Sequence, residues 1–539
     1  MKPPCDQAVI ESGSATTPCT RAAEPWILAA TILGSSMAFI DSTVVNVALP
    51  AIQSSLGGTV IDMQWVVEGY ALLLSALILT GGALGDVFGR KRMFLLGVTV
   101  FAIASVECGL AANIRELVIA RVVQGVGAAF LVPGSLSIIS ASFSESKRGR
   151  AIGTWSGFTS ITTAAGPVLG GWLIEHASWR WAFFLNVPLA VAVIALSLWR
   201  VPESKGETRT HVDLAGALLV TAGLTGLTYG FIESSSQGWT NTSVWGALVV
   251  GGTCLVYFRY FEDHASSPMV PFDLFRSSDF TGANLLTFFL YSALGIFFFL
   301  FPLNLIQVQH YSATATGAAA LPLILLMFLL SRWSGGLVDR FGAKRPLIVG
   351  PIIAAIGFLC FVFPSVGGSY WRTFFPGFVV LGLGMAISVA PLTTVVMDTV
   401  DQDLSGTASG INNAVARVGG LLAVALLGMV MVGLFSHYLN GRLTTLGLPI
   451  ALIRTVQSNE IRLAAVTVPG GLDSIRTAQL GSSIDQAFVF GFRLIMLICV
   501  GLSAASSGIA SHMIGADTPP GPNEAGRKRN EDSAARNPA

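Results

Sequence analysis

Charged residues are scarce in this 539-residue chain: Asp, Glu, Lys and Arg make up only 11% of it, against 53% hydrophobic residues. So few charges cannot cover a water-soluble protein of this length, which excludes the ordinary soluble globular classes. The net charge of +1 excludes a broad nucleic-acid footprint. No Walker-type phosphate loop occurs, so the sequence gives no sign of ATP binding or hydrolysis.

Cysteine is also rare, and the six cysteines are scattered without the spacing of a metal or redox site. We therefore predict no metal, no cofactor and no enzymatic reaction. The first 25 residues contain Pro3, Pro4 and Glu11 and have no apolar core, so they do not read as a cleavable signal peptide. We expect the first membrane span to direct insertion.

What the chain has in abundance is long apolar runs. A helix that crosses the hydrocarbon core of a bilayer needs about 20 such residues. We count fourteen runs, and the sequence thus predicts an all-α, multi-pass membrane protein with fourteen spans. They lie near residues 26–49, 63–84, 93–112, 116–141, 151–175, 181–200, 213–232, 243–260, 281–305, 316–338, 346–365, 373–397, 406–435 and 486–512.

Positive charge is distributed unequally between the two sets of loops. One set carries clusters such as Arg90–Lys91–Arg92, whereas the short loops of the other set carry only Arg115, Arg180 and Arg372. Because loops rich in Lys and Arg stay in the cytoplasm, this asymmetry places both termini there. The predicted location is the cell membrane.

One cationic turn occurs twice. Residues 82–92 read GALGDVFGRKR and residues 335–345 read GGLVDRFGAKR, at an offset of 253. Each copy joins two apolar runs, which indicates two homologous halves. The residues of interest are Gly82, Asp86, Gly89, Arg90 and Arg92 in the first copy, and Asp339, Gly342 and Arg345 in the second.

These features divide the chain into five parts. We expect a cytoplasmic tail (1–25), a six-helix bundle (26–204), two inserted helices (205–275), a second six-helix bundle (276–512) with an outer loop (436–485), and a disordered cytoplasmic tail (513–539).

Three carboxylates fall inside predicted spans, all in the first half: Asp41, Glu68 and Glu107. Ionisable groups inside a membrane are costly and are functional candidates by default. Counting residues from the helix ends places them with Arg121 in one layer ~8–12 Å below the outer surface, where they should not all be ionised together. We predict that these four residues couple proton movement. Alternatively, Glu68 and Glu107 reach the outer interface, and Arg121 forms a purely structural pair with Asp41.

Several stretches resemble a known family. The repeated turn resembles the signature of the loop between helices 2 and 3 in the major facilitator superfamily of transporters. DSTVVNVALP (41–50), RVVQGVGAA (121–129) and the stretch 153–171, ending in AAGPVLGG, resemble motifs of its fourteen-helix drug:proton antiporter branch. WRWAFFLNVP (179–188) fits the same branch. One departure is Thr162, where the motif usually has Gly.

The resemblance implies roles for further residues. The repeated turns would form a cytoplasmic gate in which Asp86 also contacts the second bundle. A seam of Gly153, Gly166, Pro167, Gly170 and Gly171 would govern exchange, although it is also a plausible kinked packing surface. Gln124, Phe288, Tyr291 and Phe298 would line a substrate cavity, with Phe289, Phe297 and Phe299 as further stacking candidates; the alternative for these aromatics is contact with lipid.

The sequence therefore predicts a monomeric transporter that exports hydrophobic or amphipathic small molecules in exchange for protons, by alternating access between two bundles. The carboxylates favour cationic substrates. Two alternatives stay open: export of one endogenous metabolite, and a membrane sensor with a transporter fold. Such a sensor could dispense with the ionisable pair and the gating turns, all of which this chain keeps.

Overall fold

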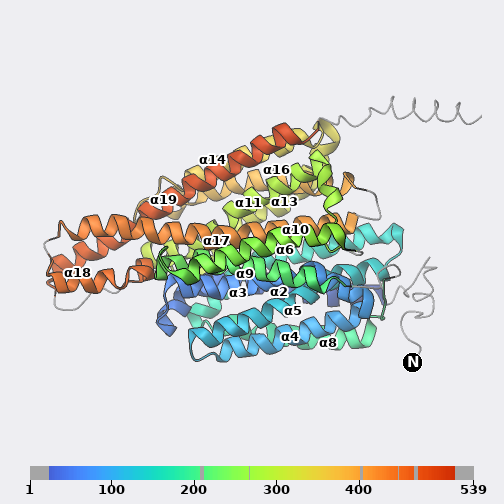
Figure 1. The fold of residues 1–539 in the computed structure, drawn as a ribbon, viewed down its shortest axis with the longest axis horizontal. Helices are drawn as coiled ribbons and strands as arrows, with labels where there is room; N and C mark the ends of the chain where they lie inside the picture. Colours follow the sequence, from blue (N-terminus) through green and yellow to red (C-terminus); the bar gives the residue numbers. More distant parts are fainter. Residues whose placement is uncertain are drawn as a thin grey trace, which may run out of the picture.

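The computed structural model describes residues 23–206, 212–265, 268–400, 405–446, 448–466 and 472–515, and these form a bundle of long helices without β-strands in that part of the chain (Figure 1). Apart from their few residues inside these limits, the predicted tails 1–25 and 513–539 lie outside the described residues.

The first half of the chain forms one layer of the molecule, shown in blue and cyan (Figure 1). Its helices are α2 (Glu24–Leu56), α3 (Val60–Phe88), α4 (Arg90–Leu110), α5 (Ile114–Ser142), α6 (Glu145–His176), α7 (Trp181–Phe184) and α8 (Asn186–Arg200). Local signals fix several ends. Thr59 and Asp62 form a capping box at the start of α3, and the Asn113 side chain caps α5.

The second half forms the other layer. Its elements are α11 (Ser278–Leu303), η2 (Asn304–Val308), α12 (Ala313–Ala319), α13 (Leu321–Phe341), α14 (Lys344–Cys360), α15 (Tyr370–Thr373), α16 (Phe375–Asp398), α17 (Ser405–Leu443), α18 (Ile450–Gln457), η4 (Glu460–Ala465) and α19 (Ser474–Met513). Two further helices, α9 (Leu214–Gln237) and α10 (Thr242–His264), and the short η1 (Phe272–Arg276) join the halves.

Twelve helices of the described residues are long and apolar enough to cross a membrane. Two of the fourteen runs predicted from the sequence are not among them. The run 346–365 corresponds to α14, which has only 17 residues, and the run 151–175 lies in α6, which carries many polar residues. The class of fold is confirmed, whereas the count of fourteen spans stays a prediction.

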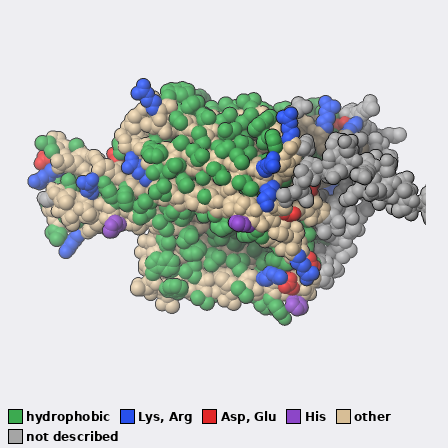
Figure 2. All heavy atoms as spheres, turned by 90° about the horizontal axis from the view of Figure 1, so that it is seen from above, with side chains coloured by type: hydrophobic (Ala, Val, Ile, Leu, Met, Phe, Trp, Pro, Cys, Tyr) green, Lys and Arg blue, Asp and Glu red, His purple; other side chains and the backbone are tan. Residues whose placement is uncertain are grey.

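The surface agrees with a lipid environment. Hydrophobic side chains cover the middle of the face seen in Figure 2, and Lys and Arg gather toward its two ends. Large apolar side chains such as Val256 on α10, which is 74% exposed, are stable in this position because lipid tails are as apolar as they are.

Glycine contacts show that the two halves are built alike. A Cβ atom added to Gly127 on α5 would lie 2.9 Å from the carbonyl oxygen of Gly97 on α4. In the second half, a Cβ atom added to Gly384 on α16 would lie 2.8 Å from the carbonyl oxygen of Gly350 on α14. Small residues allow such close backbone approach in both halves, as expected of an internal repeat.

The inserted helices pack where the two halves meet. Leu224 of α9 belongs to a buried cluster with Leu72 of α3 and Leu421 of α17. Helices α3 and α9 are also joined by a polar contact: Trp65 Nε1 on α3 donates a hydrogen bond of 3.0 Å to Glu233 Oε1 on α9. The hairpin α9–α10 therefore covers one side of the interface between the bundles.

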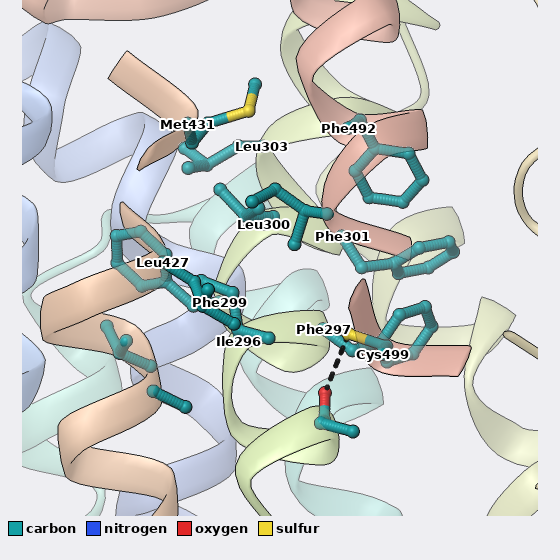
Figure 3. Close-up of a cluster of buried hydrophobic side chains, with 14 of the residues drawn as sticks. Ile296, Phe297, Phe299, Leu300, Phe301, Leu303, Leu427, Met431, Phe492 and Cys499 are labelled. Atoms are coloured by element: carbon teal, nitrogen blue, oxygen red, sulfur yellow. Dashed lines mark hydrogen bonds between the residues drawn. The ribbon is translucent and has the colours of Figure 1, made fainter. Parts of the chain in front are cut away.

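The core of the second half is aromatic and aliphatic. In Figure 3, α11 directs side chains including Phe297, Phe299 and Phe301 toward α17 and α19. The ring centroid of Phe297 lies within 6 Å of those of five other phenylalanines. The Cys499 thiol of α19 donates to the Ala293 carbonyl at 3.6 Å.

The stretch 436–485, predicted as an outer loop, is largely helical where it is described. Helices α17 and α19 continue into it and carry α18 and η4 beyond the end of the bundle (Figure 1). Segment η4 folds back onto the first half: Gln53 Nε2 donates to the Arg462 carbonyl at 3.2 Å, and Arg462 Nη2 donates to the Gly57 carbonyl at 3.1 Å. Polar composition alone did not distinguish such a helical hairpin from a loop.

Candidate functional site

A buried ion pair lies at the centre of the first half. Arg121 Nη1 of α5 is 2.5 Å from Asp41 Oδ2 of α2, and the two side chains are 1% and 0% exposed. Arg121 Nε donates to the Val66 carbonyl at 3.0 Å, and its guanidinium carbon lies 4.3 Å from the centre of the Tyr70 ring. The pair thus ties together α2, α3 and α5.

Neutral polar side chains complete the site. Gln124 Nε2 and Asn186 Nδ2 both donate to Asp41 Oδ1, at 2.8 and 3.1 Å. Gln124 Oε1 accepts a bond of 2.6 Å from Arg121, and Ser105 Oγ lies 2.8 Å from Gln124 Nε2. Helices α4 and α8 therefore join the cluster through Ser105 and Asn186.

Ser105 and Asn186 were missed in the sequence analysis. Asn186 lies within the quoted stretch WRWAFFLNVP, and a buried amide next to a known ionisable cluster was the available signal. Gln124 was predicted to line a substrate cavity. In the described conformation Gln124 lines no cavity, because it is 0% exposed and bonded to Asp41, Arg121, Ser105 and Cys108.

This arrangement depends on the negative charge of Asp41. The carboxylate of Asp41 accepts three hydrogen bonds, from Arg121, Gln124 and Asn186. Protonation would remove the charge that these donors surround and would leave Arg121 as a buried cation without its counterion. Breaking a buried pair in this way typically costs 3–5 kcal/mol, enough to favour a different packing of the helices that hold it.

Glu68 and Glu107 do not join the cluster. Glu107 is exposed on the surface of α4. Glu68 is buried, but its Oε2 atom has no hydrogen-bond partner among the described residues. One turn before it, Gln64 Nε2 donates to the Val424 carbonyl of α17 at 2.8 Å. The predicted layer of four charges therefore reduces to Asp41 and Arg121.

The aromatic residues of α11 divide into two groups. Phe288, Phe289, Tyr291 and Phe298 are half-buried, as residues beside a cavity or a lipid boundary would be. Phe297 and Phe299, at 0% and 1% exposure, belong to the apolar core. Stacking on a ligand is thus excluded for these two in this conformation.

At the predicted cytoplasmic end, the turn between α3 and α4 is held by polar contacts. Asp86 Oδ1 accepts bonds of 2.9 Å from Arg90, and the Gly206 amide donates to the Asp86 carbonyl at 2.9 Å. A contact from Asp86 to the second bundle was expected, but these partners all lie in the first bundle and the segment that follows it. Gly82, near the start of the same turn, faces α5: a Cβ atom added to it would lie 3.6 Å from the Cβ atom of Pro133.

Glu203, which follows α8, is a further part of this turn that the sequence analysis missed. Its carboxylate accepts bonds from the backbone amides of Lys91 and Arg92, at 3.0 and 3.2 Å, and thereby caps the start of α4. Gly89 has a φ of 115°, and a Cβ there would lie 2.7 Å from Glu203 Oε1. Only glycine fits this backbone beside that carboxylate.

The second copy of the turn is less fully described. Gly342 is buried with a φ of 71°, which favours glycine, and Arg345 is exposed. The side chain of Asp339 lies outside the described residues, so the predicted symmetry between Asp86 and Asp339 stays a prediction.

The predicted seam is a line of close backbone contacts at the outer end of α6. A Cβ on Gly166 would collide with Thr43 Oγ1 and one on Gly170 with Val44, both of α2. Gly171 packs against the Ala313 carbonyl of the second half, and Gly317 packs against the Pro167 carbonyl. Across the same contact, Thr314 Oγ1 donates to Glu175 Oε2 at 2.5 Å.

At its other end, α6 packs on α2, where Trp155 Nε1 donates to Ser35 Oγ at 3.1 Å, but its glycines face open space. A Cβ added to Gly153 or Gly157 would meet nothing within 4 Å, and the same holds for Gly335 and Gly336 of α13. The two halves therefore touch through α6 and α12 near the predicted outer surface. Toward the predicted cytoplasmic end they touch through α3 and α17, where a Cβ on Gly410 would lie 3.0 Å from Leu79, while the glycines of α6 and α13 face open space.

Comparison with known proteins agrees with this architecture. The family model of the Major Facilitator Superfamily matches residues 31–424. A tetracenomycin C resistance and export protein of Streptomyces glaucescens is 31% identical over 93% of this chain and 94% of its own length. The multidrug resistance protein Stp of Mycobacterium tuberculosis is 36% identical over 77% of each chain.

Solved structures support the same fold. A bacterial homologue of the human lysosomal transporter Spinster, in an inward-facing and unoccupied conformation, superposes with a TM-score of 0.61. The match covers 91% of this chain and 98% of that one, at 18% identity.

Proposed function

This chain belongs to the major facilitator superfamily of membrane transporters, and from that premise we propose that it exports small molecules in exchange for protons. Efflux of small molecules follows from its relatives, which are resistance and export proteins for tetracenomycin C, methylenomycin A and puromycin. The substrates proposed here are hydrophobic or amphipathic compounds, and no covalent chemistry is involved.

The observation that carries the proton coupling is the buried Asp41–Arg121 pair. A transporter driven by protons needs one group whose protonation changes the energy of a conformation. Asp41 meets this need, because losing its charge would leave Arg121, Gln124 and Asn186 without their common acceptor. All of these residues lie in the first bundle, which is therefore proposed as the proton-binding half.

Alternating access would use the contacts between the halves as two gates. The outer gate is the close packing of Gly171 and Pro167 of α6 against α12. The cytoplasmic gate would consist of the two repeated turns around Asp86 and Asp339. In the described conformation the outer contact is made and the glycines at the opposite ends of α6 and α13 face open space, as an inward-facing carrier requires.

The chain is a multi-pass membrane protein. We place both termini in the cytoplasm from the distribution of Arg and Lys among the loops. This orientation puts the turn at residues 82–92 inside the cell and η4 outside. A monomer suffices for the mechanism, because both bundles belong to one chain.

Dye efflux tests the proposal directly. Cells that produce the chain are loaded with ethidium, and efflux is followed with and without a protonophore. Faster efflux than in cells with the Asp41→Asn variant, abolished by the protonophore, would support proton-coupled export. Efflux that survives the protonophore, or that proceeds normally in Asp41→Asn, would refute the coupling.

A further inference from the structure

A second arginine lies inside the membrane region, and the ion pair of the first bundle does not account for it. Arg417 is in the middle of α17, within a candidate span, and is half-buried. Its Nε atom is buried without a hydrogen-bond partner, and no ion pair joins it to any carboxylate in the described ranges. A cation inside the membrane region is energetically costly, and in membrane proteins it usually marks a substrate or ion pathway or a binding site.

Neighbouring residues of α17 show which way Arg417 faces. Val418 and Leu421 pack with α3 and α9, whereas Gly419 packs against the Phe288 carbonyl of α11. With about 3.6 residues per turn, Arg417 lies on the arc between the α3 face and the α11 face, on the side away from α9. Asn413, one turn earlier on this arc, is exposed.

This arc of α17 faces the first bundle across the interface. Arg417 is close enough to the Tyr70 hydroxyl to interact with it electrostatically. The Tyr70 ring in turn lies under Arg121, whose own charge is matched by Asp41. Arg121 and Arg417, from opposite halves, thus both interact with Tyr70. Asp41 neutralises the charge of Arg121 and forms no ion pair with Arg417.

The intramembrane carboxylates leave this excess positive charge uncompensated. Asp41 is 0% exposed and fully bonded, and Glu107 is exposed on α4. Glu68 lies on a helix that contacts α17, but its Oε2 atom has no partner and it forms no ion pair with Arg417 in the described part of the chain. The expectation of cationic substrates rested on these three carboxylates. In this conformation, the intramembrane charge that lacks a counterion among the described residues is the guanidinium of Arg417.

The surroundings of Arg417 are suited to an aromatic compound. Aromatic residues lie on both helices that flank Arg417: Tyr70 on α3, with which it interacts electrostatically, and the half-buried Tyr291 on α11, whose carbonyl faces Gly420. A guanidinium beside aromatic side chains binds a planar anion through charge-assisted hydrogen bonds and stacking.

We propose that Arg417 is a substrate-binding residue, and that the preferred substrates are amphipathic aromatic anions such as carboxylates, sulfonates or ionised phenols. This inference deepens the proposed export function and rests on it. Binding of the anion would supply the countercharge that Arg417 lacks within the described part of the chain.

The test uses two dyes with the same aromatic skeleton. Anilinonaphthalene sulfonate is anionic and phenylnaphthylamine is uncharged. The full-length chain is reconstituted in phosphatidylcholine vesicles, and uptake of each dye is driven by a pH gradient.

Arg417→Gln should reduce uptake of the sulfonate about tenfold or more, because it removes one charge-assisted hydrogen bond. Uptake of the neutral dye should stay within about twofold of wild type. Arg417→Lys should restore much of the sulfonate uptake. Arg372→Gln, at an exposed arginine of the short helix α15, is the matched control and should change the uptake of neither dye.

Loss of both dyes to the same extent would overturn the inference, because Arg417 would then serve the conformational cycle. No loss of sulfonate uptake would also overturn it. An effect that appears only when phosphatidylglycerol is added would assign the anion to a lipid headgroup and would equally contradict a substrate role.

Equilibrium binding separates this inference from the export function. Displacement of bound anilinonaphthalene sulfonate by naphthoate, but not by methyl naphthoate, would support the anion site even if Arg417→Gln failed to fold. If wild type binds the sulfonate through Arg417 but transports neither dye, the export function fails and the site stands. If it transports the neutral dye but neither binds nor transports the sulfonate, the site fails and the function stands.

Discussion

The Cα atom of Gly317 on α12 packs against the carbonyl oxygen of Pro167 on α6, so closely that one added methyl group would overlap that oxygen. This contact joins the first half of the chain to the second. It belongs to the outer seam, where Gly171 makes a similar approach to the Ala313 carbonyl.

Gly317→Ala should therefore weaken closure of the outer end. Overpacking of this kind costs about 1–3 kcal/mol, or roughly tenfold in the population of the closed state. Distances between spin labels on the exposed positions His176 and Ala315 should lengthen. Gly153→Ala, near the opposite end of α6, has open space for its methyl group and should leave these distances unchanged. Equal shifts in both variants would contradict this account of the seam.

Asp41→Asn should abolish proton-coupled export and leave the protein inserted and folded. The amide keeps the size of the side chain but has no charge to titrate, and Arg121 loses its counterion. Substrate accumulation in vesicles under a pH gradient measures the coupling, and size-exclusion chromatography checks the fold. Uphill transport at the wild-type rate would rule out Asp41 as the coupling group.

Asn186→Leu should lower the rate of coupled export about tenfold. The variant removes one of the donors to Asp41 Oδ1, and a hydrogen bond to a charged group contributes about 1.5–3 kcal/mol. The same transport assay measures it. Ser105→Ala, which removes a hydroxyl that contacts Gln124 and Asn186 but not Asp41, should have a smaller effect. The reverse order would show that the amides act on packing and not on the carboxylate.

Glu203→Ala should destabilise the cytoplasmic turn by about 1–2 kcal/mol, because the amides of Lys91 and Arg92 lose their acceptor. Thermal unfolding in detergent measures the loss. Arg92→Gln is the control: its side chain is 74% exposed and its ion pair with Glu203 spans 3.6 Å, so screening by solvent leaves little to lose. A larger effect from Arg92 would mean that the ion pair, and not the helix cap, holds the turn.

Docking of η4 should depend on pH through Glu460. Burial raises the pKa of this carboxyl above its usual 4.5, against the opposing hydrogen bonds from Ser436 and Asn440. The folded form thus holds its proton more tightly than the unfolded form. The stability that protonated Glu460 contributes is fully present below pH about 4.5. It declines as the pH rises toward the raised pKa and is lost above that pKa. The protection factors of residues 456–466, which are exchange rates corrected for the intrinsic effect of pH, should fall over that interval, and Glu460→Gln should remove the fall. Protection factors that fall on acidification instead would contradict the assignment.

The sequence predicted the parts of the site that depend on depth and charge. Counting residues from the helix ends brought Asp41 and Arg121 to one level, and they form an ion pair. Glu107 was placed at a similar level, but depth does not fix the direction around the helix axis. Because α4 is apolar on nearly every side, its pattern did not show that Glu107 points outward while Ser105 and Cys108 point inward.

Neutral and unpaired groups were harder to find. An amide such as Asn186 is common in membrane helices and draws attention only when its partners are known. Arg417 was not among the predicted site residues, because no carboxylate lies inside a predicted span of the second half to draw attention to it. The two-half organisation, in contrast, followed from the repeated turns, and the structure confirms it in the paired contacts of Gly97 with Gly127 and Gly350 with Gly384.

The hairpin of α17 and α19 has a practical consequence for imaging. These helices have 39 and 40 residues, so each is about 60 Å long, roughly twice the thickness of the hydrocarbon core. The excess projects from one end of the molecule with α18 at its tip (Figure 1). Most of such a particle would be hidden in a detergent micelle, and its two similar halves are hard to tell apart in projection. A rigid rod that protrudes from one half alone breaks that symmetry and would serve as a built-in fiducial for aligning electron micrographs without an added antibody fragment.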